Sequence, residues 1–347
     1  MKKCELSIII PIYNGDRFLK ETLDSVLNQS YKDYELILVD DGSTDDTARI
    51  CDLYAAKDTR IRVRHQQNGG MSNARDNGYK MAQKDTWIAF LDADDIFHRD
   101  MFRDMMKYKN SDFVIVCFKN VLSSKISDCP FDIHEKHIKN ISGKEMLYRL
   151  FEPEKNNGNF SIVGMLINRD FYAKMQKYIY NAKAVLPQNY LNDVYCVPRL
   201  FFYAEKVTLL NNAYIHRRIS RYTDSRLIKP NALHYELALA NKMNLEFYKK
   251  QGCRFAYEKH LIGFYLVILK LWYQIVTSEP DLSKQKKYVK LVEKYYKEYH
   301  EELVKIRCRT FREHIIKRTI LLWGVNKTFW KITVGNIRYG VLYRIQT

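Results

Sequence analysis

Along the first 120 residues, segments with the hydrophobic pattern of strands alternate with segments that have the hydrophobic pattern of helices. Short apolar runs predict strands over residues 5–12, 34–39, 61–65 and 87–91. Between them an apolar residue recurs every three or four positions, which predicts helices over residues 16–29, 45–56 and 71–83. Strands that alternate with helices of this length predict a parallel, doubly wound α/β sheet.

The pattern changes in the second half of the chain. Apolar runs predict strands over Phe160–Ile167 and Lys206–Leu210. Beyond Pro230 the period is helical, and long helices are predicted over Ala232–Tyr248, Ala256–Thr277 and Lys284–Tyr299. These patterns predict an α/β domain over residues 1–228, with halves at 1–120 and 121–228, and a helical appendage over residues 229–347.

No apolar stretch reaches the roughly 20 residues that span a bilayer. The richest segment, Leu261–Val276, contains Lys270 and is interpreted as a buried helix. The N-terminal apolar run ends at Pro11 and lacks a signal-peptide pattern. The seven cysteines are scattered without close pairs, so we expect reduced thiols in a cytoplasmic protein rather than zinc ligands or disulfides.

The net charge of +17 is concentrated at the C-terminal end. Residues 303–347 contain ten Lys and Arg, six aromatic residues and one acid, Glu313. Such a basic aromatic tail suits an anionic membrane surface. A solvated basic helix and a nucleic-acid surface are the alternatives, but no nucleic-acid motif supports the last.

Three acids in four residues follow the strand at 87–91. Asp92, Asp94 and Asp95 are expected at the carboxyl edge of the sheet, where ligands of open α/β sheets bind. Like charges at this spacing repel unless a cation or hydrogen-bond donors compensate them, and Mg²⁺ and similar cations prefer oxygen ligands. A helix-capping acidic turn is the alternative interpretation.

Three more polar turns occur in the same half, at residues 11–14, 40–45 and 68–75. The turn at 11–14 offers a tyrosine ring for stacking, and the turn at 40–45 offers carboxylates that can bind a base or a ribose. The turn at 68–75 offers a helix start and a guanidinium that can bind phosphate. Each turn alone is ordinary turn chemistry. Together with the acidic turn they predict a site for a nucleoside diphosphate and a metal ion.

These motifs, in this order and spacing, resemble the family 2 glycosyltransferases of GT-A fold. The resemblance covers about the first 120 residues and rests on SIIIPIYN, VDDGSTD, NGG with AR, and LDADD, which begin at Ser7, Val39, Asn68 and Leu91. It implies an inverting hexosyltransferase that uses a UDP-sugar and Mn²⁺ or Mg²⁺. Pro11, Tyr13 and Asp41 are then expected to hold the nucleoside.

The same resemblance assigns the remaining donor and metal groups. Arg75 is expected at the base or the phosphates, Asp92 at the ribose or the metal, and Asp94 as the main metal ligand. Asp95 is expected as a helix cap or a supporting group. In the segment after Tyr214, His216 is a candidate metal ligand and Arg217 or Arg218 a phosphate clamp, with a basic surface cluster as the alternative.

Inversion also requires a base that takes the proton of the acceptor hydroxyl. By the resemblance this base is Asp193, in the stretch that begins at Gln188. The residue before it is Asn192 where the family usually has a glutamate, which is a departure from the pattern. The alternative is that Asp193 is an ordinary acid at a helix start.

We therefore expect a peripheral enzyme at the inner face of the plasma membrane, acting on a surface glycan such as capsule or lipopolysaccharide. Its expected partners are a UDP-sugar, a lipid-linked glycan acceptor and an anionic membrane surface, and not nucleic acid. The alternatives are an inactive sugar-nucleotide-binding protein and, less consistent with the acidic turn, a basic nucleic-acid-binding protein.

Overall fold

The computed structural model describes residues 3–122, 126, 129–133, 138–151, 161–180, 182–183, 185–186, 193–219, 232–278, 281–308 and 311–323. The chain divides into two compact units. Unit 1 contains residues 1–147 and 156–225, and unit 2 contains residues 148–155 and 226–347. The predicted boundary at residue 228 lies outside the described residues.

Unit 1 is built on one sheet with the strand order β3-β2-β1-β4-β8-β6-β9-β5, and β7 pairs with β9. Its first four strands are parallel: β1 (Leu6–Ile12), β2 (Tyr34–Asp40), β3 (Ile61–His65) and β4 (Trp87–Phe90). The helices between them are α1 (Asp16–Leu27), α2 (Thr47–Lys57) and α3 (Met71–Met81). The predicted elements of this half are confirmed, with end points that differ by no more than two residues.

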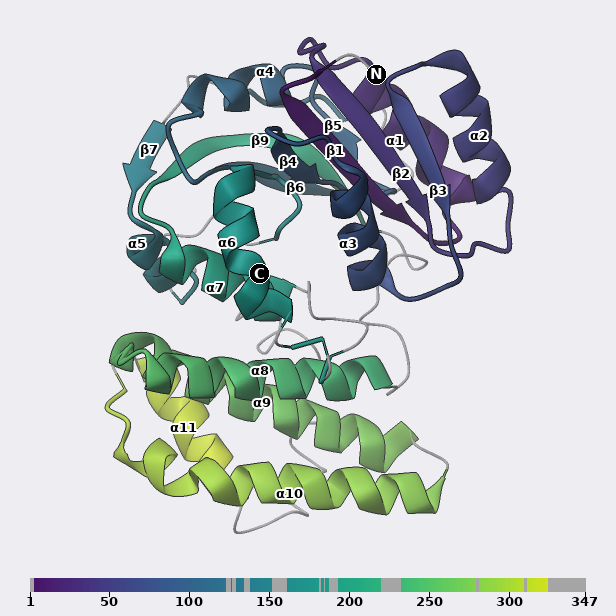
Figure 1. The fold of residues 1–347 in the computed structure, drawn as a ribbon. Coiled ribbons are helices and arrows are strands. Elements are labelled where there is room, and N and C mark those ends of the chain that lie inside the picture. The colour runs from purple at the N-terminus through teal and green to yellow at the C-terminus, as the bar shows by residue number, and fades with distance from the viewer. Residues whose placement is uncertain are drawn as a thin grey trace. The chain divides into compact units, whose positions relative to one another are not determined.

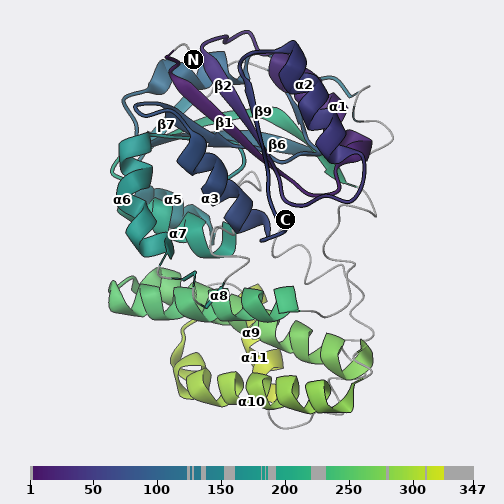
Figure 2. The same ribbon diagram turned by 45° about the vertical axis from the view of Figure 1, so that its right-hand side comes forward.

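Helices cover both faces of the sheet, and the side chains of β1 point alternately toward one face and the other (Figures 1 and 2). Ile8 and Ile10 belong to the core cluster that contains Leu23 of α1. Ile9 points the other way, toward α3, where a Cβ added to Gly78 would lie 2.3 Å from its methyl group. Because both faces are covered, β1, β2 and β4 are rich in buried apolar residues, whereas β3 at the edge of the sheet buries only Ile61.

The second half of the sheet is mixed rather than parallel. β8 (Met165–Ile167) lies between β4 and β6 (Phe113–Leu122) and is antiparallel to both. The strand predicted over Lys206–Leu210 extends further, through the segment after Tyr214, as β9 (Val207–Ile219), which is parallel to β6. Of the predicted strand Phe160–Ile167, only the last three residues form β8, and Phe160 itself lies outside the described residues.

Two short strands and five helical segments complete unit 1. β5 and β7 both pair antiparallel with β9. Their bounds, and those of the helices, are β5 (Ile96–Phe97), β7 (Ile138–Ile141), α4 (Met101–Met105), a 3₁₀ turn (Met106–Tyr108), α5 (Gly143–Arg149), α6 (Arg169–Tyr180) and α7 (Asp193–Tyr203).

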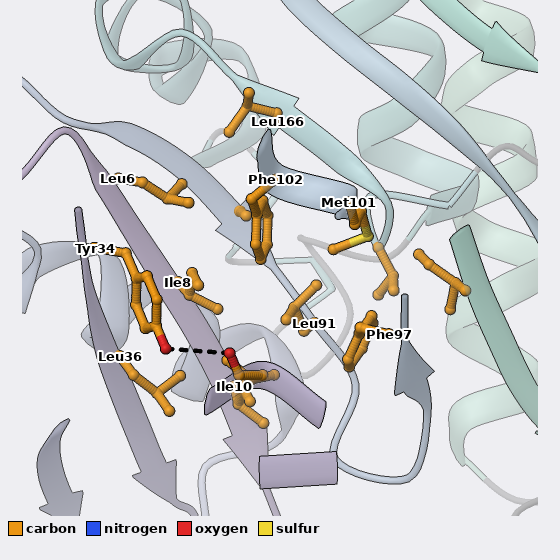
Figure 3. Close-up of a cluster of buried hydrophobic side chains, with 14 of the residues drawn as sticks. Leu6, Ile8, Ile10, Tyr34, Leu36, Leu91, Phe97, Met101, Phe102 and Leu166 are labelled. Atoms are coloured by element: carbon orange, nitrogen blue, oxygen red, sulfur yellow. Dashed lines mark hydrogen bonds between the residues drawn. The ribbon is translucent and has the colours of Figure 1, made fainter. Parts of the chain in front are cut away.

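The core of unit 1 joins the two halves of the sheet. Figure 3 shows side chains of β1 and β2 meeting Phe97, Met101 and Phe102 from the segment after the acidic turn, with Leu166 of β8. All are almost fully buried. The ends of β4 and β5, and so the acidic turn between them, are anchored in this core.

Unit 2 is helical, as predicted, and consists of α8 (Ala232–Lys250), α9 (Arg254–Ser278), α10 (Leu282–Lys305) and α11 (Phe311–Trp323). In Figure 1, α9 lies between α8 and α10. Leu261, Phe264 and Ile268 of α9 are buried among these helices, which agrees with the interpretation of this segment as a core helix. Across the described residues, no helix is both long and apolar enough to span a bilayer.

Candidate active site

The carboxyl ends of three parallel strands bring the predicted residues to one edge of the sheet. Ile12 lies opposite Asp40 in the register of β1 and β2, and Ile9 lies opposite Phe90 in β4. The turns that begin at Tyr13, Asp41 and Asp92 therefore leave the sheet at this edge. Pro11, in the last part of β1, is half-buried beside Val39.

Tyr13 presents its ring at this edge, with 55% of the side chain exposed. The residue after it, Asn14, adopts a positive φ of 50°. Its side-chain oxygen accepts a hydrogen bond from the Thr44 N–H at 2.8 Å, and its own N–H donates to the Ser43 hydroxyl at 2.9 Å. The turns after β1 and β2 are thus tied together, and the Tyr13 ring is left available for stacking.

The carboxylate of Asp41 is buried and binds the turn after β3. One oxygen accepts hydrogen bonds from the Gly69 N–H at 2.9 Å and the Gln66 side-chain amide at 2.7 Å. The other oxygen accepts the Gly70 N–H at 2.8 Å. Asp41 therefore organises the start of α3, a role that sequence reasoning missed, and its predicted contact with the nucleoside stays a prediction.

Gly42 is required by the close approach of the same two turns. It adopts a φ of +75°, and a Cβ at this position would lie 2.8 Å from the backbone nitrogen of Asn68. Only glycine combines this backbone conformation with this contact at little cost.

The acidic turn is paired with α3 through Arg75. The buried guanidinium of Arg75 lies 3.1 Å from Asp92. Burial and the charge of Asp92 raise the pKa of Asp94 to about 6. Burial and the charges of Asp92 and Asp94 raise the pKa of Asp95 well above its ordinary value. The three carboxylates therefore share one region of strong negative potential.

Arg218 fixes the backbone of this turn. Its N–H donates to the Asp95 carboxylate at 3.0 Å, and its guanidinium donates to the Asp94 carbonyl at 2.9 Å and to Glu21 of α1 at 2.7 Å. The guanidinium also lies 4.1 Å from the ring centre of Phe18. Arg218 thus positions the acidic turn, and sequence reasoning did not find its partner Glu21 because no local pattern joins them.

Arg217 points to the other face of β9. Its guanidinium stacks 3.6 Å from the ring centre of Phe118 and remains partly exposed. Its charge lowers the pKa values of both Asp94 and Asp95 against the larger effect of burial. The predicted phosphate clamp is therefore electrostatically close to the acidic turn, and its contact with a phosphate stays a prediction.

Asp193 is the first residue of α7, and its carboxylate contacts the segment before β8. It accepts the Ile162 N–H at 2.8 Å and a hydrogen bond from the Ser161 hydroxyl. Burial raises the pKa of Asp193, while the charge of Arg75 acts against that rise. The predicted base thus lies within the field of the acidic site; the rest of its motif, Gln188–Asn192, lies outside the described residues.

His216 does not join the acidic turn in this arrangement. It is fully buried opposite Ile96, and its ring stacks on Phe131 at 3.7 Å. Burial and the positive charges of Lys119 and His98 lower the pKa of His216 to about 4. Both ring nitrogens are buried and have no hydrogen-bond partner among the described residues, and the predicted role of His216 as a metal ligand stays a prediction.

The acidic turn suits a hard divalent cation by its donor chemistry. Asp92 and Asp94 offer carboxylate oxygens, and burial together with the charge of Asp92 raises the pKa of Asp94, an effect that a bound cation would oppose. Within the described ranges, no group of three or more His, Cys, Asp or Glu side chains could hold a metal ion. These two carboxylates would therefore need diphosphate oxygens or water to complete a coordination shell.

The chain was compared with known protein families, curated proteins and solved structures. Residues 7–175 match the family model described as "Glycosyl transferase family 2". This match and the mixed α/β sheet agree with the α/β fold of GT-A type that the resemblance implied, and the predicted C-terminal helical appendage is present as α8–α11.

Two curated relatives align with large parts of the chain. Glycosyltransferase GlyG of Streptococcus pneumoniae serotype 4 is 29% identical over 226 residues, which are 62% of this chain and 71% of GlyG. Cholesterol galactosyltransferase of Borreliella burgdorferi is 28% identical over 322 residues, 88% of this chain and 82% of the relative. The crystal structure of S. aureus TarS 1–349 in complex with UDP-GlcNAc covers 93% of this chain and 82% of its own, with 15% identity and a TM-score of 0.47, which is a loose likeness only.

Proposed function

We propose that this protein, whose residues 7–175 match the family 2 glycosyltransferase model, is a glycosyltransferase. It transfers a hexose from a UDP-sugar, with inversion, to a hydroxyl of a lipid-linked surface glycan. The observation that carries this proposal is the juxtaposition of the acidic turn, Arg75 and Asp193 at one edge of the sheet.

The donor end of the site is assigned to the turns after β1 and β2. Tyr13 stacks on the base with its exposed ring. Asp41 lies beside it and holds the start of α3, so that backbone N–H groups and Arg75 face the donor. Arg217, held by its stacking on Phe118, provides a second guanidinium for the diphosphate.

The acidic turn is proposed to hold Mn²⁺ or Mg²⁺ through Asp94 and Asp92. When bound, the cation supplies positive charge for the departing diphosphate. Arg218 contributes by holding the Asp94 carbonyl and the Asp95 carboxylate, which keeps the turn in place.

Asp193 is proposed as the base that accepts the proton of the acceptor hydroxyl. Its bond from the Ile162 N–H fixes one carboxylate oxygen, and a raised pKa makes a carboxylate a stronger base near neutral pH. The acceptor hydroxyl then attacks the anomeric carbon on the face opposite the diphosphate, so that the bond to the diphosphate breaks as the new glycosidic bond forms.

A lipid-linked acceptor at the inner face of the plasma membrane is supported by two observations. One relative that aligns over most of this chain is named for galactose transfer to cholesterol, which is a lipid. The net charge of +17 favours an anionic surface. The tail beyond residue 323, on which the sequence argument partly rested, lies outside the described residues.

The test is UDP release across a panel of UDP-sugars, with and without Mn²⁺, for the unaltered protein and Asp94→Ala. Asp33→Ala is the matched control, because Asp33 is an exposed aspartate at the start of β2. We expect metal-dependent release from one donor, lost in Asp94→Ala and kept in the control. UDP binding without release from any donor, even with lipid extracts as acceptor, would instead favour an inactive sugar-nucleotide-binding protein.

A further inference from the structure

His65, the last residue of β3, lies between two carboxylates. Its Nδ1 is 2.9 Å from Asp40 Oδ2, directly opposite in β2, and its Nε2 is 3.1 Å from Asp52 Oδ1 in α2. A carboxylate ion only accepts hydrogen bonds, so each ring nitrogen needs a proton to bond with its partner. The two contacts together therefore require the imidazolium form of His65.

The surroundings of His65 favour this charged form. The hydrogen bond to Asp40 and the contact with Asp52 raise the pKa of His65 against the effect of partial burial. β3 packs mainly against β2 and α2, and the other titratable group beside the two carboxylates is Cys51 of α2. Burial and the charges of Asp40 and Asp52 raise the pKa of this thiol to about 12, so it stays neutral. The neighbouring Arg64 is exposed, and the alternation of β3 places it on the opposite side of the strand.

Asp40 connects His65 to the turn that carries Tyr13. The second oxygen of the Asp40 carboxylate accepts the Ser43 N–H at 3.0 Å, and the Ser43 hydroxyl accepts the Asn14 N–H at 2.9 Å. The Asp40 side chain is almost fully buried, so these bonds and the contact with His65 determine its position. A chain of hydrogen bonds thus runs from the exposed end of β3 to the turn after β1.

We propose that His65 is a positioning residue of the donor site, whose imidazolium holds the turns after β1 and β2 in the arrangement that binds UDP. A neutral imidazole has a single N–H, so it can donate to Asp40 or to Asp52 but not to both. The nitrogen without a proton then faces a carboxylate, and the hold on Asp40 weakens. The proposal deepens the proposed function and rests on it for the identity of the donor.

The direction of the pH dependence follows from the raised pKa of His65. The bridge between the carboxylates is complete below the ordinary pKa of 6.5 and is lost as the pH rises through the raised pKa. UDP affinity should therefore fall over the same range. Because His65 and Asp52 are both partly exposed, the contact contributes little, and we expect the Kd for UDP to rise about 3-fold. UDP should in turn raise the pKa of His65, because coupling between two sites is reciprocal.

The experiment measures UDP affinity by calorimetry from about pH 6 to about pH 9, the range in which a perturbed histidine titrates. In Asp52→Asn the amide can donate to the neutral ring while Nδ1–H donates to Asp40, so the fall in affinity should disappear. In His65→Gln the amide donates to Asp40 at every pH, with the same result. The controls are Asp33→Asn and His314→Gln, which change the same residue types at exposed positions. All variants share the titration of UDP itself.

The effect of Asp52 separates positioning from a purely structural role. Its side chain is 65% exposed, and its printed contact is with His65, so its replacement has no other route to the donor site than the histidine. NMR titration of the histidines, with the His65 signal assigned from its absence in His65→Gln, measures the pKa in each variant. Asp52→Asn should lower the pKa of His65, because it removes one of the two negative charges.

A pH dependence of UDP binding that is the same in Asp52→Asn and in the unaltered protein would overturn the proposal. So would a His65 that titrates at or below its ordinary pKa, or a pKa that UDP does not change. Absence of UDP binding at every pH would instead count against the proposed function, and the histidine titration then decides by itself whether the imidazolium bridge exists.

Discussion

Replacement of Asp41 by asparagine tests whether this carboxylate holds the turn before α3. The substitution keeps the size of the side chain but removes its charge and turns one acceptor into an NH₂ donor. In the structure all three partners of the carboxylate are donors: the N–H groups of Gly69 and Gly70 and the amide of Gln66.

The magnitude follows from these three bonds. An asparagine can direct its oxygen to Gly69 and Gln66, but its NH₂ group then faces the Gly70 N–H. A buried donor left without an acceptor costs about 1–3 kcal/mol, and each of the other two bonds loses the gain from the charged acceptor, about 0.5–1 kcal/mol. We therefore expect Asp41→Asn to lower the free energy of unfolding by about 2–5 kcal/mol.

Urea unfolding followed by circular dichroism measures this loss, with Asp33→Asn as control at an exposed position. UDP affinity is then measured below the unfolding range. A loss of stability with weaker UDP binding fits a residue that supports the donor site. An unfolding midpoint equal to that of the control would refute the reasoning, because the three donors would then have found other partners.

Three further predictions concern single contacts. Arg218→Lys keeps the charge but cannot donate to both the Asp94 carbonyl and Glu21 as the guanidinium does, so kcat/KM in the UDP-release assay should fall about 10-fold or more. Unchanged kinetics would exclude the positioning role of Arg218. In urea unfolding, Gly42→Ala should destabilise the protein by about 1–3 kcal/mol more than Gly252→Ala, because both glycines have a positive φ but only Gly42 has no space for an added Cβ. Equal losses of stability in the two variants would contradict this. The lowered pKa of His216 means that its contribution to stability is complete above pH 6.5 and is lost as the pH falls toward about 4, so the free energy of unfolding should drop by about 2 kcal/mol between pH 7 and pH 5. His216→Phe should weaken this pH dependence, as measured by urea unfolding at several pH values. An equally steep dependence in the variant would assign the effect to another group.

The parallel half of the sheet could be predicted because its signals are local. β1, β2 and β4 contain short apolar runs, β3 alternates apolar and basic residues, and the helices between them have apolar residues at helical spacing. β8 could not be predicted in the same way, since it has three residues and exists only through pairing with β4 and β6 from distant parts of the chain. Long-range pairing with β6 also extends β9 to Ile219, beyond the predicted end at Leu210.

The same distinction between local signals and long-range contacts applies to the candidate site. The location of Asp92 was predicted from its position after a strand, which is a local feature, and Asp193 was assigned by the resemblance of its local motif. Their partners were not: Ile162 and Glu21 are distant in sequence from the groups that they support. The burial of His216 could not be predicted either, because alternation along β9 does not determine which face of the strand points to the core.

A competition between charge and burial explains the acidic turn. Arg75, Arg217 and Arg218 bring three positive charges to the three carboxylates, yet the pKa values of Asp94 and Asp95 remain raised. Burial and mutual repulsion therefore outweigh attraction to the arginines. The Arg218 guanidinium donates hydrogen bonds to the backbone carbonyl of Asp94 and to Glu21, which fixes the turn without neutralising the Asp94 carboxylate. The turn is thus rigidly positioned but still short of positive charge, which is the electrostatic condition that a divalent cation would relieve.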